Sequence, residues 1–91
     1  MSTNNPNLSE LSNKSLLDRI TIDPNILAGK PIIRGMRISA EQILKALSRG
    51  MTHKEILSEF PVLEEDDIKA VLQYAYEIIS VEKIYPLKQV S

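Results

Sequence analysis

The chain has 91 residues, of which 43% are apolar, so it can bury one modest core and has no room for a second domain. With no cysteine and a single histidine, it offers neither disulfides nor a thiolate or histidine-rich metal site, and we expect no metal and no cofactor. Its 11 basic and 12 acidic residues give a net charge of −1, which alone does not favour nucleic acid as a partner.

The N-terminal segment, residues 1–18, is predicted to be flexible or weakly helical. Its first residues are polar and lack both the cationic start and the apolar run of a signal peptide. Four leucines between Leu8 and Leu17 favour a weak helix over Ser9 to Asp18. Because no later segment is long enough to span a bilayer, we expect a cytoplasmic protein without membrane contact.

A small β-ribbon is predicted next, at the start of a domain over residues 19–85. The β-branched run at residues 20–22 predicts a short strand, and Ile32-Ile33 predicts a second one that pairs with it across residues 25–30. The two glycines of residues 29–38 permit backbone conformations closed to other residues, and Pro31 fixes its own φ, so we predict a small bent ribbon here. Two strands of this length are marginal alone, so they must pack on helices.

The first core helix is predicted to run from about Ala40 to Arg49. Ser39 and Gln42 have the spacing of a capping box, in which each side chain bonds the backbone amide of the other. Gly50 stands where a helix ends in a left-handed residue. The helix therefore has both a start and a stop signal.

Two further helices follow, joined by a short apolar turn. Thr52 and Glu55 form a second capping box, and Pro61 ends the helix that they begin. The next helix should run from about Glu65 to beyond Glu82, followed by a tail at residues 86–91. The fold class is therefore mainly α, a three-helix bundle with a short N-terminal β-ribbon, in which the second and third helices form a helix-turn-helix.

Charge is distributed unevenly along the chain. Between residues 30 and 55, six cations stand against two acids, a net charge of +4. We predict a nucleic-acid surface made of these cations, namely Lys30, Arg34, Arg37, Lys45, Arg49 and Lys54. The alternative for residues 29–38 is a solvated hairpin that carries ordinary surface charge. The acids at residues 64–67 have a simpler explanation, because they suit the positive end of the third helix dipole.

The third helix carries two apolar stripes about one residue step, roughly 100°, apart. The first should meet the other helices and consists of Ile68, Leu72, Ala75 and Ile79. The second is predicted to form a homodimer interface and consists of Val71, Tyr74, Ile78, Val81 and Tyr85. Alternatively, the leucines of the N-terminal segment fold back and cover that second stripe.

The string Gly-Lys-Pro-Ile-Ile-Arg-Gly at residues 29–35, with Arg37-Ile38 after it and Ile20 to Pro24 before it, resembles the small prokaryotic family known as domain of unknown function 433. The resemblance implies a homeodomain-like fold related to winged helices. It also implies an antitoxin-like protein encoded beside a PIN-like nuclease toxin, and no established catalytic activity. Ala28, where members often have glycine, and Met36, where threonine is usual, depart from the pattern.

An enzyme is not expected, because no nucleophile, histidine and carboxylate stand in a recognisable arrangement. We interpret the isolated His53 as a solvated residue in the first turn of its helix. The leading hypothesis is an antitoxin-like DNA-binding regulator that binds its own operator and masks a PIN-like toxin through a tail, either residues 1–18 or 84–91. The alternative is a protein-interaction module without nucleic-acid binding, in which Lys30, Arg34 and Arg37 are structural.

Overall fold

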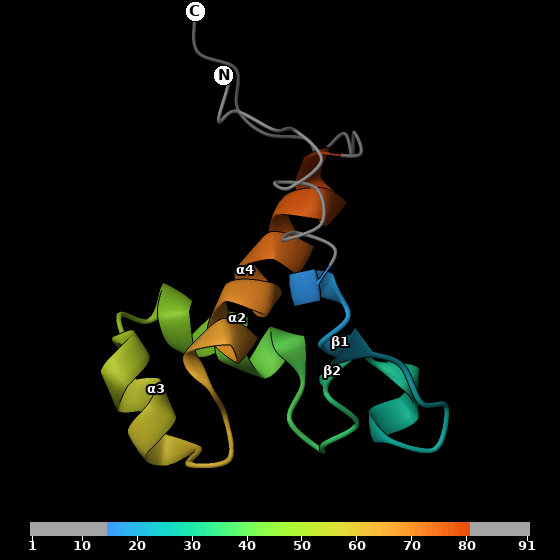
Figure 1. Cartoon of the computed structure of the whole chain (residues 1–91), viewed down its shortest axis with the longest axis horizontal. Coiled ribbons are helices and arrows are strands. Elements are labelled where there is room, and N and C mark those ends of the chain that lie inside the picture. The colour runs from blue at the N-terminus through green and yellow to red at the C-terminus, as the bar shows by residue number, and fades with distance from the viewer. Residues whose placement is uncertain (1–14, 81–91) are drawn as a thin grey trace, which may run out of the picture.

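The computed structural model describes residues 15–80 and is mainly helical, with one small antiparallel sheet (Figure 1). Residues 15–17 are helical and precede the first strand. The elements in chain order are β1 (Ile20–Thr21), the short 3-10 element η1 (Leu27–Gly29), β2 (Ile32–Ile33), α2 (Ala40–Ser48), α3 (His53–Glu59) and α4 (Glu65–Ser80). The predictions for residues 1–14 and 81–91 lie outside the described residues. Between residues 15 and 80, no helix is long and apolar enough to cross a membrane.

The predicted pairing of the two strands is confirmed. β1 and β2 are antiparallel, with Ile20 opposite Ile33 and Thr21 opposite Ile32. β2 also bridges Ser39 on its other side, so its backbone is bonded on both edges. Both β2 side chains are fully buried, which explains why a two-residue strand is held in place.

Left-handed backbone shapes the ribbon at two places. Leu27, Ala28 and Gly29 all have positive φ, at 50°, 56° and 80°, so η1 is a left-handed turn. Further on, Arg34 and Gly35 have φ of 47° and 72°, and the Met36 amide donates to the Ile33 carbonyl at 2.8 Å. Two central residues with positive φ are typical of a type I′ hairpin turn, which here leads from β2 to the bridge at Ser39.

The helix boundaries follow their predicted caps closely. Thr52 and Glu55 form the reciprocal capping box of α3. Ser39 Oγ accepts from the Gln42 amide at 3.0 Å, which confirms Ser39 as the N-cap of α2, whereas a capping box with both of its bonds is found only for α3 within residues 15–80. Gly50, at φ 96°, ends α2 with its amide bonded to the Leu47 carbonyl, as predicted.

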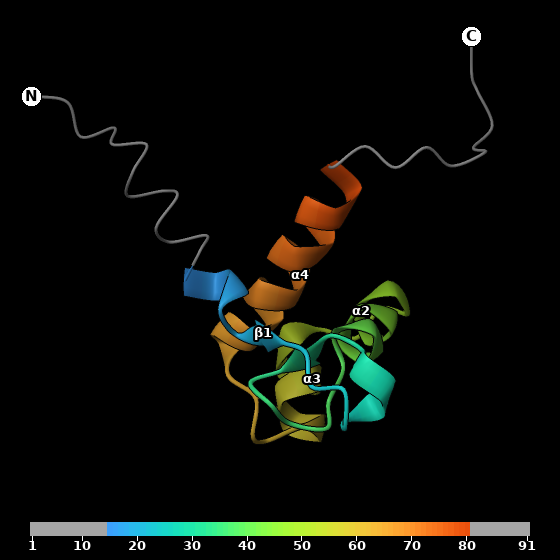
Figure 2. The same ribbon diagram turned by 90° about the vertical axis from the view of Figure 1, so that its right-hand side faces the viewer.

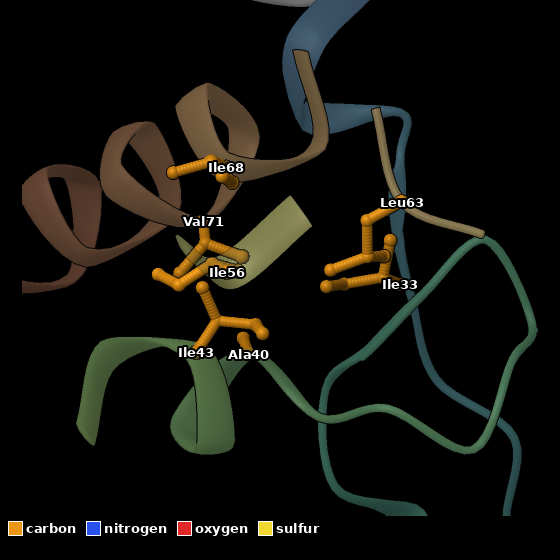
Figure 3. Close-up of a cluster of buried hydrophobic side chains, with 7 residues drawn as sticks. All are labelled: Ile33, Ala40, Ile43, Ile56, Leu63, Ile68 and Val71. Carbon is orange, nitrogen blue, oxygen red and sulfur yellow. The ribbon is translucent and has the colours of Figure 1, made fainter. Parts of the chain in front are cut away.

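One apolar cluster joins the ribbon to the three helices (Figure 3). It is made by Ile33, Ala40, Ile43, Ile56, Leu63, Ile68 and Val71. Each fully buried isoleucine contributes roughly 2–3 kcal/mol relative to an exposed one. Figures 1 and 2 show that the end of α4 extends away from α2 and α3, so only its first half completes this core.

Candidate nucleic-acid interface

The most heavily bonded polar group is the carboxylate of Asp67, in the first turn of α4. Its side chain is fully buried. Oδ1 accepts from Arg34 Nε at 2.9 Å and from Arg19 Nη1 at 3.0 Å. Oδ2 accepts from Arg34 Nη2 at 2.8 Å and from the Glu64 backbone amide at 2.7 Å. The network therefore ties the residue before β1, the turn after β2 and the start of α4 to one carboxylate.

The same network determines the protonation of its members. Burial alone would raise the pKa of Asp67, but hydrogen bonds from Arg34, the Glu64 amide and Arg19 outweigh it, so the pKa lies below its ordinary value. The bond to Asp67 raises the pKa of Arg34, and bonds to Glu64 and Asp67 raise that of Arg19. All three groups are thus charged at neutral pH.

Arg34 is the clearest departure from the predicted nucleic-acid surface. Its guanidinium forms a two-pronged pair with Asp67 and also donates to the Val62 carbonyl at 3.0 Å. The left-handed turn at Arg34 and Gly35 directs this side chain to α4. The guanidinium of Arg34 is therefore already bound within the chain, and its contact with a nucleic acid stays a prediction.

The other two ribbon cations differ from each other. Lys30 Nζ lies 3.0 Å from Glu41 Oε1, in a pair whose side chains are 56% and 71% exposed. An ion pair so exposed contributes little to stability, roughly 0–1 kcal/mol. Arg37 is exposed. The ribbon therefore offers fewer free cations than its sequence suggests.

The acids at the start of α4 each have a partner within the chain. Glu64 pairs with Arg19 at 2.8 Å, and Asp66 approaches the same guanidinium at 3.8 Å. Glu65 Oε2 lies 2.5 Å from His53 Nδ1, so the histidine expected to be solvated links α3 to α4. The helix dipole therefore accounts for only part of this acidic cluster. Arg19 was missed by sequence reasoning, because no short-range motif connects it with residues 45 to 48 positions later.

Four predicted cations remain available for an external partner. Within residues 15–80, no ion pair involves Arg37, Lys45, Arg49 or Lys54, and all four are exposed. Lys45 and Arg49 stand one turn apart at the end of α2, and Lys54 lies in the first turn of α3. These positions leave the cations of α2 and α3 open to a partner, and the nucleic-acid surface stays a prediction.

A cavity of about 300 Å³ opens between α2 and the end of α3. Its lining consists of Gln42, Lys45, Ala46, Arg49, Met51, Glu59 and Phe60. Two of the available cations are therefore in its wall.

In the described part of the chain, no group of three acidic or histidine side chains is arranged to hold a metal ion.

The buried and exposed positions of α4 do not follow the two predicted stripes. Val71 is fully buried in the core and Tyr74 is packed against it. Neither side chain is therefore free to form the predicted dimer surface. Ile78, on the same face, is 42% exposed because it lies past the end of the core. Val81 and Tyr85 lie outside the described residues.

The stripe that was expected to face the core is largely exposed instead. Ile68 is buried as predicted, but Leu72 and Ile79 are 42% and 68% exposed, and Tyr76 beside them is 63% exposed. The reason is that Ile68 and Val71 together fix the rotation of α4, turning the face of Leu72 outward. We call Leu72, Tyr76 and Ile79 the α4 stripe.

Comparison with known proteins gives a family and a fold. The profile of the family described as "Protein of unknown function (DUF433)" matches residues 20–75. The chain is also similar to the crystal structure of a DUF433 member protein from Anabaena variabilis, with 22% identity and a TM-score of 0.65. That likeness covers 89% of this chain and 80% of the other. No curated protein matches the sequence significantly.

Proposed function

Since the chain belongs to the DUF433 family, whose function is unknown, we propose that it is an antitoxin-like, DNA-binding regulator of a toxin–antitoxin module, acting without catalysis on a PIN-like nuclease toxin. The observation that supports this proposal most is the set of four exposed cations, Arg37, Lys45, Arg49 and Lys54, which have no acidic partner within residues 15–80. Cations of this kind bind phosphates and release counterions from DNA.

The proposal includes a homeodomain-like arrangement of α2, α3 and α4, with α3 and α4 as the helix-turn-helix. In that motif the first turn of the second helix usually approaches the DNA. Here that turn carries Glu65, Asp66 and Asp67, which would be repelled by phosphates. DNA therefore contacts α2 and the first turn of α3 in our proposal, rather than the start of α4.

A homodimer completes the proposal, because four cations neutralise only a few phosphates. The α4 stripe is the proposed dimer surface, since three large apolar side chains at helical spacing are exposed there. Replacing Tyr76 with Glu should give monomers by sedimentation equilibrium. A dimer that persists in this variant would exclude the stripe as the interface.

We assign toxin binding to one of the two chain ends, residues 1–18 or residues 84–91. Most of these residues lie outside the described part of the chain. A neighbouring gene for a PIN-like nuclease, whose toxicity is suppressed by co-expression with this chain, would support the assignment. Toxicity that is unchanged by co-expression would contradict it.

The test of DNA binding is fluorescence anisotropy on a duplex from the upstream region of the gene, against a scrambled duplex, over several salt concentrations. Each phosphate contact removed should lower the slope of log affinity against log salt by about 0.9. Lys45→Ala should show this loss, whereas Lys69→Ala, which removes the same charge from an exposed position of α4, should not. Equal effects of the two variants, or no binding at low salt, would contradict the proposed surface.

A protein-interaction module without nucleic-acid binding is the second candidate. Two observations favour it: Arg34 and Lys30 are occupied by acids of the same chain, and the α4 stripe is exposed. In that case the protein should bind no duplex at any salt concentration, while Tyr76→Glu should still abolish association with its partner.

A further inference from the structure

The cavity between α2 and α3 combines three kinds of chemistry in one small space. Lys45 and Arg49 supply two positive charges from adjacent turns of α2. Met51 and the half-buried Phe60 supply apolar surface, one of them aromatic. Glu59, at the end of α3, supplies a carboxylate.

The charges in this cavity do not neutralise one another. Glu59 forms no ion pair with Lys45 or Arg49 within the described chain, although all three residues line the same cavity. An isolated carboxylate beside two cations would only weaken binding to a smooth phosphate backbone. It becomes useful when the ligand has a hydrogen-bond donor as well as an anionic group.

The size of the cavity limits what can enter. A volume of about 300 Å³ lies at the small end of ligand sites, which span roughly 300–1,000 Å³. The cavity therefore holds a single unit rather than a length of polymer. The exterior of a base-paired duplex has no group that would need an aromatic recess, because its bases are stacked inside.

We propose that this cavity accepts one unstacked nucleotide of a single-stranded nucleic acid. Lys45 and Arg49 hold the flanking phosphates, and Phe60 with Met51 contacts the face of the base. Glu59 accepts a hydrogen bond from an exocyclic amino group, as carboxylates do from cytosine N4. This inference rests on the proposed nucleic-acid function and adds a single-stranded ligand to the duplex proposed above.

The direct experiment compares the full chain on labelled oligo-dC and oligo-dT, because thymine lacks an exocyclic amino group. We expect oligo-dC to bind about tenfold more tightly. Glu59→Ala should remove this preference. Glu41→Ala is the matched control, because it removes an acid of α2 that does not line the cavity. It should strengthen binding to both oligonucleotides and leave the preference intact.

Phe60→Leu tests the aromatic contact and should weaken binding to oligo-dC about tenfold. Circular dichroism and thermal melting show whether this variant remains folded, and Glu59→Ala gives an independent result if it does not. Equal binding of oligo-dC and oligo-dT by the unmodified chain overturns the inference. If the operator duplex is still bound in that case, the proposed function survives alone. If neither ligand binds, both proposals fail.

Discussion

The basic ribbon and the helical cations have similar charge in the sequence but opposite surroundings in the structure. In the ribbon, Arg34 is turned onto the buried carboxylate of Asp67 and Lys30 onto Glu41. On α2, Lys45 and Arg49 remain exposed, with no acidic partner in the described part of the molecule. An arginine in a glycine-rich turn can therefore be a structural contact, whereas cations on regular helices are the better candidates for binding.

Removing the buried carboxylate should have the largest effect on the stability of the domain. Asp67→Asn should destabilise the domain by about 3 kcal/mol, because two arginines lose their ionised acceptor and the amide cannot replace it. Chemical denaturation measures the free energy of unfolding. Asp66→Asn, at a neighbouring position that is 54% exposed, should cost less than about 0.5 kcal/mol. Similar losses in both variants would show that the network is not structural.

Low pH should lower the free energy of unfolding by protonating the same carboxylate. The pKa of Asp67 in the folded state lies below the unfolded value of 3.8. Its contribution is therefore fully present above that pH and is lost as the pH falls through the folded pKa. The free energy of unfolding should fall below about pH 4, and less steeply in Asp67→Asn than in the unmodified chain. Parallel pH profiles would contradict this assignment.

Arg34→Lys should have a smaller effect, a loss of about 1–2 kcal/mol in stability. Lysine keeps the charge but cannot make two parallel bonds to one carboxylate and a third to the Val62 carbonyl. Arg37→Lys is the matched control, because Arg37 is exposed. It should leave the midpoint of urea unfolding unchanged, and a comparable drop there would refute the distinction.

Relief of backbone strain in the turn at residues 27–29 should stabilise the domain. Ala28 has φ of 56° in the left-handed turn, a conformation that costs an L-residue roughly 1–2 kcal/mol. Ordering a glycine costs more conformational entropy than ordering an alanine, and this cost offsets part of the relieved strain. Ala28→Gly should therefore stabilise the domain by about 0.5–1 kcal/mol. The same change at Ala46, inside α2, should destabilise by about 1 kcal/mol. Thermal melting should show shifts of opposite sign.

The smallest effect on stability is expected from the helical cations. Replacing Lys45 and Arg49 together by Ala should change the free energy of unfolding by less than about 0.5 kcal/mol, since neither residue has an ion-pair partner within residues 15–80. The same variant should lose nucleic-acid binding. Unfolding of this variant would place both residues among the structural cations.

Local signals predicted most of the described fold. The strand pair, the Thr52 capping box and the stop at Gly50 were all predicted from patterns that are short in the sequence. Each depends on backbone geometry that the nearby residues impose themselves. The structure adds the left-handed turn at residues 27–29, which no glycine marks at Leu27 or Ala28.

The candidate site was less predictable, because its contacts depend on tertiary packing. Arg34 and Asp67 are 33 residues apart, and no spacing rule connects a turn arginine with a helix acid at that distance. The choice between the two stripes of α4 had the same difficulty. Val71 and Leu72 are neighbours of similar hydrophobicity, and only the position of the other helices decides which is buried.

The Asp67 network also has a consequence for folding kinetics. Its side-chain bonds close loops of 33 and 48 residues, whereas the caps of α2 and α3 join residues three apart. Long loops cost more entropy to close, so local helices form before such contacts do. Interactions made after the transition state act mainly on the unfolding rate. We therefore expect the bonds from Arg19 and Arg34 to Asp67 to act mainly on the unfolding rate, and so on the lifetime of the folded domain, with a smaller effect on the folding rate.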